Sequence, residues 1–91
     1  MELKWTSKGL SDLARLYDSL SIANKQAETK TVQTLVSAPT SLLKHPYMGE
    51  KLEGFKPRDV RRLFVGHYEI RYEIQQSIIY VLRLWHTREE R

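Results

Sequence analysis

The residues whose chemistry stands out lie together at the end of the chain, in the stretch YVLRLWHTREER. An unperturbed histidine titrates at about pH 6.5, so His86 can take up and return a proton at neutral pH. The guanidinium of Arg83 can hold a phosphate or a carboxylate in a fixed geometry, and Arg61 and Arg62 stand on an earlier predicted strand. Cleavage of RNA would use such groups: a base for the 2′-hydroxyl proton and cations that stabilise the phosphorane.

The same reaction also needs an acid that protonates the leaving oxygen, and no second proton carrier stands beside His86. The tyrosines of the later strands are predicted to face the core, and they are Tyr68, Tyr72 and Tyr80. The three histidines lack the spacing of zinc ligands, and the chain has no cysteine and no glycine-rich phosphate loop. We therefore expect neither a metal nor another cofactor.

Arg83 and His86 also have ordinary structural explanations. Alternation along IIYVLRLW places Arg83 in an otherwise apolar row, where an unpaired charge is costly. A carboxylate across the sheet, Glu69 or Glu73, would then hold the guanidinium. A histidine at the end of a strand is commonly a packing or surface residue, so both explanations stay open.

Basic residues are segregated by type along the chain, whose formal net charge is +4. All seven lysines lie at or before Lys56, and seven of the eight arginines lie from Arg58 onward, with Arg15 as the exception. Arginine offers a planar fork that suits carboxylates, phosphates and aromatic faces. The segregation is explained either by solvated surface or by a C-terminal half that recognises an anionic partner.

Length and composition indicate one globular domain over residues 1–91. With 41% hydrophobic and 29% charged residues, the chain is neither disordered nor fibrous. No stretch approaches the roughly 20 apolar residues of a membrane span, and the opening MELKWTSKG lacks the apolar segment of a signal peptide. A cytoplasmic location is therefore expected.

Hydrophobic periodicity predicts a strand and two helices in the first half of the chain. Residues 2–5 fit a strand, and Ser7 is expected to cap a helix over residues 8–21. The apolar face of that helix is predicted to carry Leu10, Leu13, Ala14, Tyr17 and Leu20. Asn24 is expected to cap a second helix, which Pro39 kinks or splits. The stripe of this helix comprises Ala27, Thr31, Leu35 and Ala38.

The second half predicts a three-stranded antiparallel meander, VRRLFV, HYEIRYEI and IIYVLRLW, with short gaps at Gly66 and at QQS. The middle strand alternates strictly, and its wet face is predicted to carry His67, Glu69, Arg71 and Glu73. One face of the last strand would carry Ile78, Tyr80, Leu82 and Leu84. Trp5, Tyr17, Phe64 and Trp85 are expected in the core or at its rim. The expected fold is α+β, with an N-terminal strand and a helical hairpin packed on a small antiparallel sheet.

Taken in order, these segments resemble the RelE/ParE superfamily of bacterial toxins from type II toxin–antitoxin operons. The likeness spans essentially the whole chain, including Pro46 and Gly49 of HPYMGEKLEG, the run VRRLFVGHYEIRYEI, and the closing IIYVLRLWHTREER. The resemblance implies the two-layer RelE/ParE-like fold. It also implies one of two activities: RelE-like members are ribosome-dependent endoribonucleases that cut messenger RNA, whereas ParE-like members bind DNA gyrase and block replication.

The nuclease pattern is matched only in part. Arg62 and Arg83 match its basic positions and His86 its histidine, but the tyrosine expected after the histidine is Thr87. The position after Tyr68, basic in the nucleases, is Glu69, whose charge is expected to repel an RNA phosphate. These departures favour a gyrase inhibitor. The alternatives are a ribosome-dependent endoribonuclease with His86 as base, and a non-toxic module that binds an antitoxin.

The resemblance also implies two partners and the surfaces that meet them. The residues expected to bind the target are Arg61, Arg62, Arg83, His86, Arg88 and Arg91. An acidic, partly disordered antitoxin that folds on binding is expected to cover Trp5, Arg15, Arg83 and the outer face of the helical hairpin. Glu89 and Glu90 are assigned to neither surface, and no membrane contact is expected.

Overall fold

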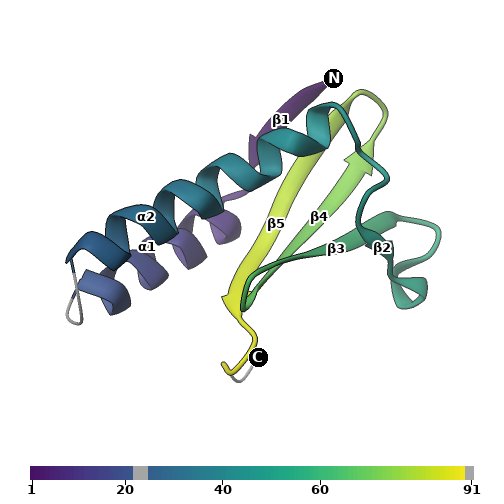
Figure 1. Ribbon diagram of the computed structural model, residues 1–91. Helices are drawn as coiled ribbons and strands as arrows, with labels where there is room; N and C mark the ends of the chain where they lie inside the picture. The colour runs from purple at the N-terminus through teal and green to yellow at the C-terminus, as the bar shows by residue number, and fades with distance from the viewer. Residues whose placement is uncertain (22–24, 90–91) are drawn as a thin grey trace.

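The computed structural model describes residues 1–21 and 25–89, in which two helices lie along one face of a twisted sheet (Figure 1). The elements in order are β1 (Glu2–Trp5), α1 (Ser7–Ser21), α2 (Lys25–Ser37), the 3-10 helix η1 (Ala38–Leu43), β2 (Glu50–Lys51), the 3-10 helix η2 (Glu53–Phe55), β3 (Asp59–Val65), β4 (Tyr68–Gln75) and β5 (Ile78–His86). The predicted elements are confirmed to within one residue at their ends. The start of the second helix is not compared, because residues 22–24 lie outside the described ranges. Pro39 marks the change from α2 to η1 as expected. The predicted cap Asn24 lies outside the described residues, as do Glu90, Arg91 and the side chains of Leu20 and Ala27.

The sheet is mixed, whereas an antiparallel sheet was predicted. Its order is β1-β5-β4-β3-β2, and β1 pairs with β5 in parallel while the other neighbours are antiparallel. The predicted α+β fold class is confirmed, and only the purely antiparallel pairing was wrong, because the prediction left β1 outside the sheet. Parallel partners need a long crossover, and the helical hairpin and the whole meander provide one between β1 and β5. Within the described ranges, no helix is both long and apolar enough to cross a membrane.

Thr6, not the predicted Ser7, caps helix α1. Its Oγ1 accepts the Gly9 N–H at 3.0 Å. The same hydroxyl lies 3.0 and 3.1 Å from the carbonyl oxygens of Val81 and Leu82, to one of which it donates. A Cβ at Gly9 would lie 2.6 Å from the Val81 oxygen, so only glycine allows this close approach. The start of α1 is thereby fixed to β5 just beyond the end of β1.

A bulge in the pairing of β5 with β4 breaks the strict alternation that was predicted for β5. Arg71 lies opposite Arg83 and Tyr72 lies opposite Val81, so Leu82 has no cross-strand partner. The extra residue shifts the alternation by one. Ile79 and Val81 before the bulge and Leu84 after it are buried on the core side, whereas strict alternation had put Ile78, Tyr80, Leu82 and Leu84 on one face. Trp85, on the other face, is buried as well.

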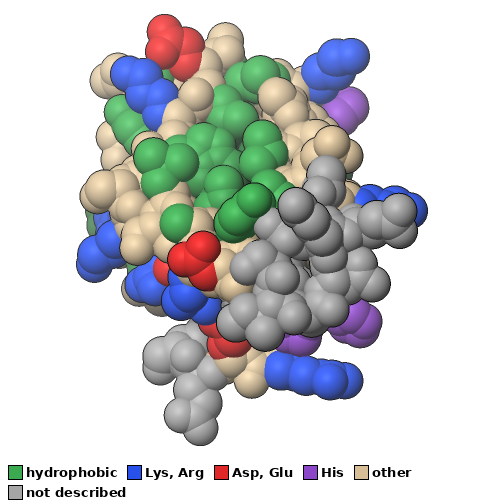
Figure 2. Space-filling view, turned by 90° about the vertical axis from the view of Figure 1, so that its left-hand side faces the viewer, with side chains coloured by type: hydrophobic (Ala, Val, Ile, Leu, Met, Phe, Trp, Pro, Cys, Tyr) green, Lys and Arg blue, Asp and Glu red, His purple; other side chains and the backbone are tan. Residues whose placement is uncertain are grey.

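Helix α1 also packs on the sheet with a face other than the predicted one. Leu16 and Asp12 are buried, whereas Leu10 and Tyr17 of the predicted core stripe are about half exposed. Asp12 turns this face inward because it binds β5, as described below. Leu10, Ala14 and Tyr17 are consequently left on the outer surface of the helical layer, while Leu13 packs against the core. The space-filling view shows hydrophobic side chains gathered on this surface (Figure 2).

Tyr72 fixes the loop that joins the helical layer to β2. Its buried hydroxyl donates to the Pro46 carbonyl oxygen at 2.8 Å and accepts the Gly49 N–H at 2.9 Å. A Cβ at Gly49 would lie 2.6 Å from the tyrosine oxygen, which explains a glycine in this loop. Burial raises the pKa of Tyr72, so the hydroxyl stays protonated and keeps its donor.

Candidate functional site

Three arginines form a row across the sheet, on the face away from the helices. Arg62 of β3 lies opposite Arg71 of β4, and Arg71 lies opposite Arg83 of β5. The neighbours Ile70 and Tyr72 are buried in the core, so Arg71 and its cross-strand partners project from the other face. Like charges directly opposite one another repel, so this arginine row (Arg62, Arg71 and Arg83) needs compensating carboxylates.

Each arginine of the row, and Arg58 beside it, has a carboxylate partner. The pairs are Arg62–Glu50 at 2.9 Å, Arg71–Glu69 at 3.1 Å, Arg83–Asp12 at 2.8 Å and Arg58–Glu73 at 2.8 Å. In three of the pairs the carboxylate is the inner partner. The Asp12, Glu69 and Glu73 side chains are 8%, 0% and 5% exposed, against 46%, 21% and 53% for their arginines. This face therefore presents cations outward and keeps the balancing anions beneath them.

Asp12 of α1, rather than the predicted Glu69 or Glu73, holds Arg83. Its Oδ2 accepts both the Arg83 Nε–H at 2.8 Å and the Leu84 backbone N–H at 2.9 Å. Burial acts to raise the pKa of Asp12, but the hydrogen bonds from Arg83 and Leu84 and the charges of Arg83 and Arg15 outweigh it and leave the pKa below its ordinary value. β1 pairs with β5 only as far as Val81, and Asp12 binds the same edge of β5 three residues later, at Leu84. Asp12 thus joins helix α1 to β5.

Glu69 and Glu73 were predicted to be on a wet face, and the structure shows both buried. The prediction was wrong because arginines and aromatic rings cover that face. Arg71 lies 4.8 Å from the centre of the Trp85 ring and 5.5 Å from that of Phe55. The hydrogen bonds from Arg58 lower the pKa of Glu73 and outweigh the opposing effect of its burial.

Phe64 also departs from the prediction, which placed it in the core or at its rim. Its side chain is 53% exposed on the same face of the sheet, with the Arg62 guanidinium 5.4 Å from its ring centre. Arg62 and Phe64 thereby extend the cationic and aromatic character of this face toward β2.

His86 lies on the helix side of the sheet, so the structure does not bring it together with the arginine row. It stands opposite Tyr68, whose ring meets it edge-on at 5.0 Å, and it stacks on His67 at 5.9 Å. Its Nδ1 accepts the Arg88 backbone N–H at 3.1 Å. Burial and the charge of Glu89 raise the pKa of Tyr68.

The segment after β5 is tied to helix α1. Arg15 Nη1 lies 2.6 Å from Glu89 Oε2, and the Glu89 N–H donates to the His86 carbonyl oxygen at 2.9 Å. Glu89, which was expected to belong to no site, is therefore the residue that fixes this segment. Arg88 is exposed beside it, and Arg91 lies outside the described residues.

Arg61 and Trp5 have surroundings that differ from those of the other predicted site residues. Arg61 points to the core side, pairs with Asp59 at 2.9 Å and donates to the Gly49 carbonyl oxygen at 3.0 Å. Its guanidinium also covers the Tyr47 ring at 5.0 Å. Trp5 is half-buried against the core. Arg61 and Arg62, adjacent in sequence, thus face opposite sides of the sheet.

The helical layer carries two grooves of about 310 Å³ each. The outer groove lies between α1 and α2 and is lined by Leu10, Leu13, Ala14, Tyr17, Asp18 and Val32. The second groove lies between α2 and the β3–β4 turn, and its lining includes Leu35, Val65, His67 and Tyr68. Both could accept the apolar face of a partner segment.

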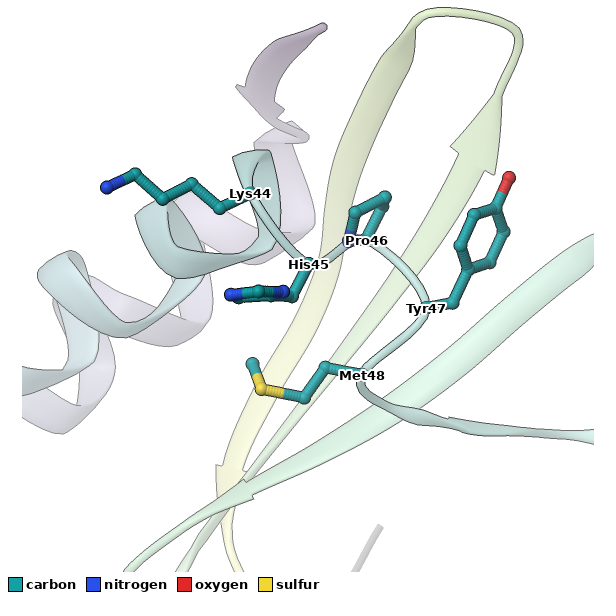
Figure 3. A pocket seen from close by; sticks show the side chains of 5 residues that line it. All are labelled: Lys44, His45, Pro46, Tyr47 and Met48. Atoms are coloured by element: carbon teal, nitrogen blue, oxygen red, sulfur yellow. The ribbon is translucent and has the colours of Figure 1, made fainter.

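A further hollow of about 490 Å³ lies at the loop after η1 and is formed by one short stretch, residues 44–48. The side chains of Lys44 and Tyr47 point away from one another, while His45 and Met48 lie on the same side of the loop (Figure 3). The stretch brings no set of groups together that would support catalysis.

Comparison with known proteins relates the chain to a described family and to solved structures. The sequence profile of the family described as "ParE toxin of type II toxin-antitoxin system, parDE" matches residues 3–91. A solved structure described as "Chromosomal ParDE TA system from P. aeruginosa" has a TM-score of 0.79 and 26% sequence identity, over 94% of this chain and 95% of that one. No curated protein sequence gives a significant match.

Proposed function

The chain belongs to the ParE toxin family of type II toxin–antitoxin systems, and from that membership we propose that it binds DNA gyrase and stalls replication. The match over residues 3–91 is the observation that carries the proposal. A binding inhibitor needs no chemistry of its own. It needs a rigid surface with a few desolvated anchors, for which arginine and aromatic residues are favoured.

The placement of His86 supports a binding inhibitor over a nuclease. A nuclease must bring its base and its cations to the same phosphate. His86 lies on the helix side of the sheet, while the arginine row lies on the other side. Thr87 stands where the nuclease pattern has a tyrosine, and its hydroxyl neither stacks on a base nor serves as an acid.

The charge of Glu69 does not weigh against a nuclease, although the sequence suggested that it would. Its carboxylate was expected to repel an RNA phosphate, but it is buried and paired with Arg71. The case against the nuclease therefore rests on Thr87 and on the separation of His86 from the arginines.

The proposed gyrase-binding residues are the C-terminal ones. Arg83, His86 and Arg88 lie at the end of β5 and just after it, and the Arg15–Glu89 ion pair holds this segment in place. Arg91 belongs to the same proposal from its position in the sequence. Arg62 forms a second tier with Arg61, whose guanidinium is already engaged by Asp59.

We further propose that a cognate antitoxin binds the helical layer and that the toxin acts in the cytoplasm, where gyrase works. The exposed stripe of Leu10 and Tyr17 provides the apolar contact, and Arg15 provides a charge for an acidic segment. Arg83 projects from the other face of the sheet and belongs to this interface only at the edge where Asp12 holds it. Trp5, at the start of this layer, lies at the margin of the proposed interface. The likeness to a chain from a chromosomal ParDE system supports an assembly of toxin and antitoxin.

Two assays on the purified toxin test the proposed function. The first is supercoiling by gyrase with trapping of cleaved plasmid, and the second is ribosome-dependent cleavage of a defined messenger RNA. Linear plasmid together with intact RNA is the expected result. Cut RNA with normal supercoiling would show the endoribonuclease instead, and no effect in either assay would leave the non-toxic antitoxin-binding module.

A further inference from the structure

We propose that the sheet face opposite the helices holds a binding site for the phosphodiester groups of DNA. Its centre is a pocket of about 440 Å³, here called the open-face pocket, lined by Thr6, Ser7, Lys8, Phe55, Arg58, Arg71, Leu82 and Arg83. The toxin would contact through it the DNA segment that gyrase holds, and this second statement rests on the proposed function.

The arginines of the pocket keep N–H groups available for a ligand. Arg58 and Arg83 each use Nε and Nη2 for their buried carboxylates, Glu73 and Asp12. The Nη1 groups of both make no hydrogen bond within the described residues. Arg71 donates to Glu69 through Nη2, and its Nε is buried without an acceptor among the described residues, so the ligand-facing N–H groups are those of Arg58 and Arg83. The carboxylates thus orient the guanidinium groups from below without covering their outer edges.

The start of helix α1 adds further donors to the same pocket. The Thr6 hydroxyl oxygen accepts a hydrogen bond from the Gly9 N–H, and the first-turn amides of Ser7 and Lys8 have no intrahelical acceptor. The positive end of the helix dipole favours an anion at this point. The Lys8 ammonium, for its part, forms no ion pair with any described residue and is exposed, so it can meet a ligand freely.

The shape of this face suits an extended polyanion. Neighbouring strands lie about 4.8 Å apart, so the row of Arg62, Arg71 and Arg83 spans roughly 10 Å. A single small anion would meet only part of that row. Exposed Phe64 and half-buried Phe55 stand beside the guanidinium groups of Arg62 and Arg71, with the ring centres 5.4 and 5.5 Å away.

The apolar grooves that suit a protein partner lie elsewhere. The outer groove, with Leu10 and Tyr17, is on the helical layer. The open-face pocket offers only Phe55 and Leu82 as apolar lining, which is little for the side chains of an amphipathic peptide. Its described lining contains no histidine or carboxylate that could act as a general base, so the site is proposed to bind and not to cleave.

The first test measures binding of a fluorescein-labelled DNA duplex of about 20 base pairs by fluorescence anisotropy, at about 50 and 200 mM salt. Lys8→Glu is compared with Lys44→Glu, an exposed lysine at the end of η1 outside the pocket. Each substitution removes one positive and adds one negative charge, so the formal net charge falls from +4 by two in both. We expect Lys8→Glu to weaken binding about five- to tenfold with a shallower salt dependence, and Lys44→Glu to change it less than about twofold.

A charge-neutral pair of substitutions gives a second test. Arg58→Gln combined with Glu73→Gln removes the outward cation together with its buried partner and leaves the net charge at +4. We expect DNA binding to weaken about three- to tenfold, with the fold checked by circular dichroism. Unchanged binding by the folded double variant would overturn the proposed site, because only the overall charge would then matter. If the double variant does not fold, the Lys8 comparison decides.

Three other results would also overturn the inference. They are no DNA binding at about 50 mM salt, equal loss in the Lys8 and Lys44 variants, and preferential competition by a polyglutamate peptide, which would identify an acidic protein as the partner. Since gyrase is absent from this assay, its outcome is separate from that of the supercoiling assay. A toxin that binds DNA through Lys8 without inhibiting gyrase would keep the site and refute the proposed function. Gyrase inhibition with no effect of Lys8→Glu on DNA binding would refute the site alone.

Discussion

At the residue scale, Asp12 shows how one buried carboxylate joins distant parts of the chain. It binds Arg83 and the Leu84 backbone N–H, which lie 71 and 72 positions away. Helical periodicity left Asp12 out of the predicted core-facing stripe because a local pattern carries no information about such a partner. A carboxylate partner was one of two explanations that the sequence left open for Arg83, and the residues named for it were Glu69 and Glu73, whereas the partner is Asp12.

Replacing Asp12 by Asn should destabilise the protein by about 1–3 kcal/mol at pH 7, because Arg83 and the Leu84 N–H lose a charged acceptor. The pKa of Asp12 is lowered in the folded state, so its contribution is present above the unfolded pKa of about 3.9 and is lost as the pH falls through the folded value. Urea unfolding at pH 7 and at about pH 2.5 should therefore show the gap between wild type and variant closing in acid. Glu2→Gln, at an exposed carboxylate, is the control. A gap that stays constant with pH would contradict the role given to Asp12.

Tyr72 supports a second prediction. Tyr72→Phe removes the hydroxyl that serves the Pro46 carbonyl oxygen and the Gly49 N–H, so the free energy of unfolding should fall by about 1–2 kcal/mol. Tyr47→Phe, at a side chain that is 64% exposed, should change it by less than about 0.5 kcal/mol. Equal effects in chemical unfolding would show that the Tyr72 hydroxyl does not fix the loop.

At the element scale, the type and order of the helices and of the long strands were predictable because their periodicity is strong. Two features were not. The bulge at Leu82 depends on pairing between β4 and β5, and the parallel pairing of β1 joins the two ends of the chain. Both depend on tertiary contacts that local sequence does not specify. The bulge determines which β5 side chains reach the core, and the pairing with β1 leaves the Leu84 backbone N–H of β5 free to bind Asp12. The arginine row was missed for the same reason: Arg71 was placed on the correct strand, but its register with Arg62 and Arg83 was not used.

The segment after β5 gives a prediction about an element boundary. Glu89→Gln should weaken the contact with Arg15 and speed hydrogen exchange of the Arg88 and Glu89 amides. Because the Arg15 and Glu89 side chains are 47% and 28% exposed, global stability should change by less than about 0.5 kcal/mol. Glu53→Gln, which removes an exposed pair with Lys56, is the control and should leave these amides unaffected. Unchanged exchange in the Glu89 variant would mean that Arg15 does not hold the segment.

At the scale of the whole molecule, the two faces of the sheet have different characters. The helical side presents apolar grooves, and the open side presents cations above buried carboxylates. This division allows the protein to meet an antitoxin on one side and an anionic partner on the other. A cationic surface was predictable from the sequence, but Arg61 and His86 were grouped with arginines from which the sheet keeps them apart. The antitoxin surface stays a prediction.

The antitoxin surface can be tested with two exposed apolar residues. Leu10→Glu places a charge in the outer groove and should weaken antitoxin binding at least tenfold, measured by titration calorimetry. Met48→Glu makes the same change of charge on the loop after η1 and should leave the affinity within about twofold. Both side chains are about half exposed, so the free toxin should remain folded. Equal affinities for the two variants would place the antitoxin elsewhere.

The central claim is that this ParE-family toxin acts by binding gyrase and not by turnover. The most direct measurement is a titration of gyrase supercoiling with toxin at several gyrase concentrations. We predict inhibition that saturates as a binding curve, with a midpoint that rises with gyrase concentration once gyrase exceeds the dissociation constant, and recovery when antitoxin is added. Full gyrase activity in excess toxin, with substoichiometric toxin cutting messenger RNA on ribosomes, would contradict the claim.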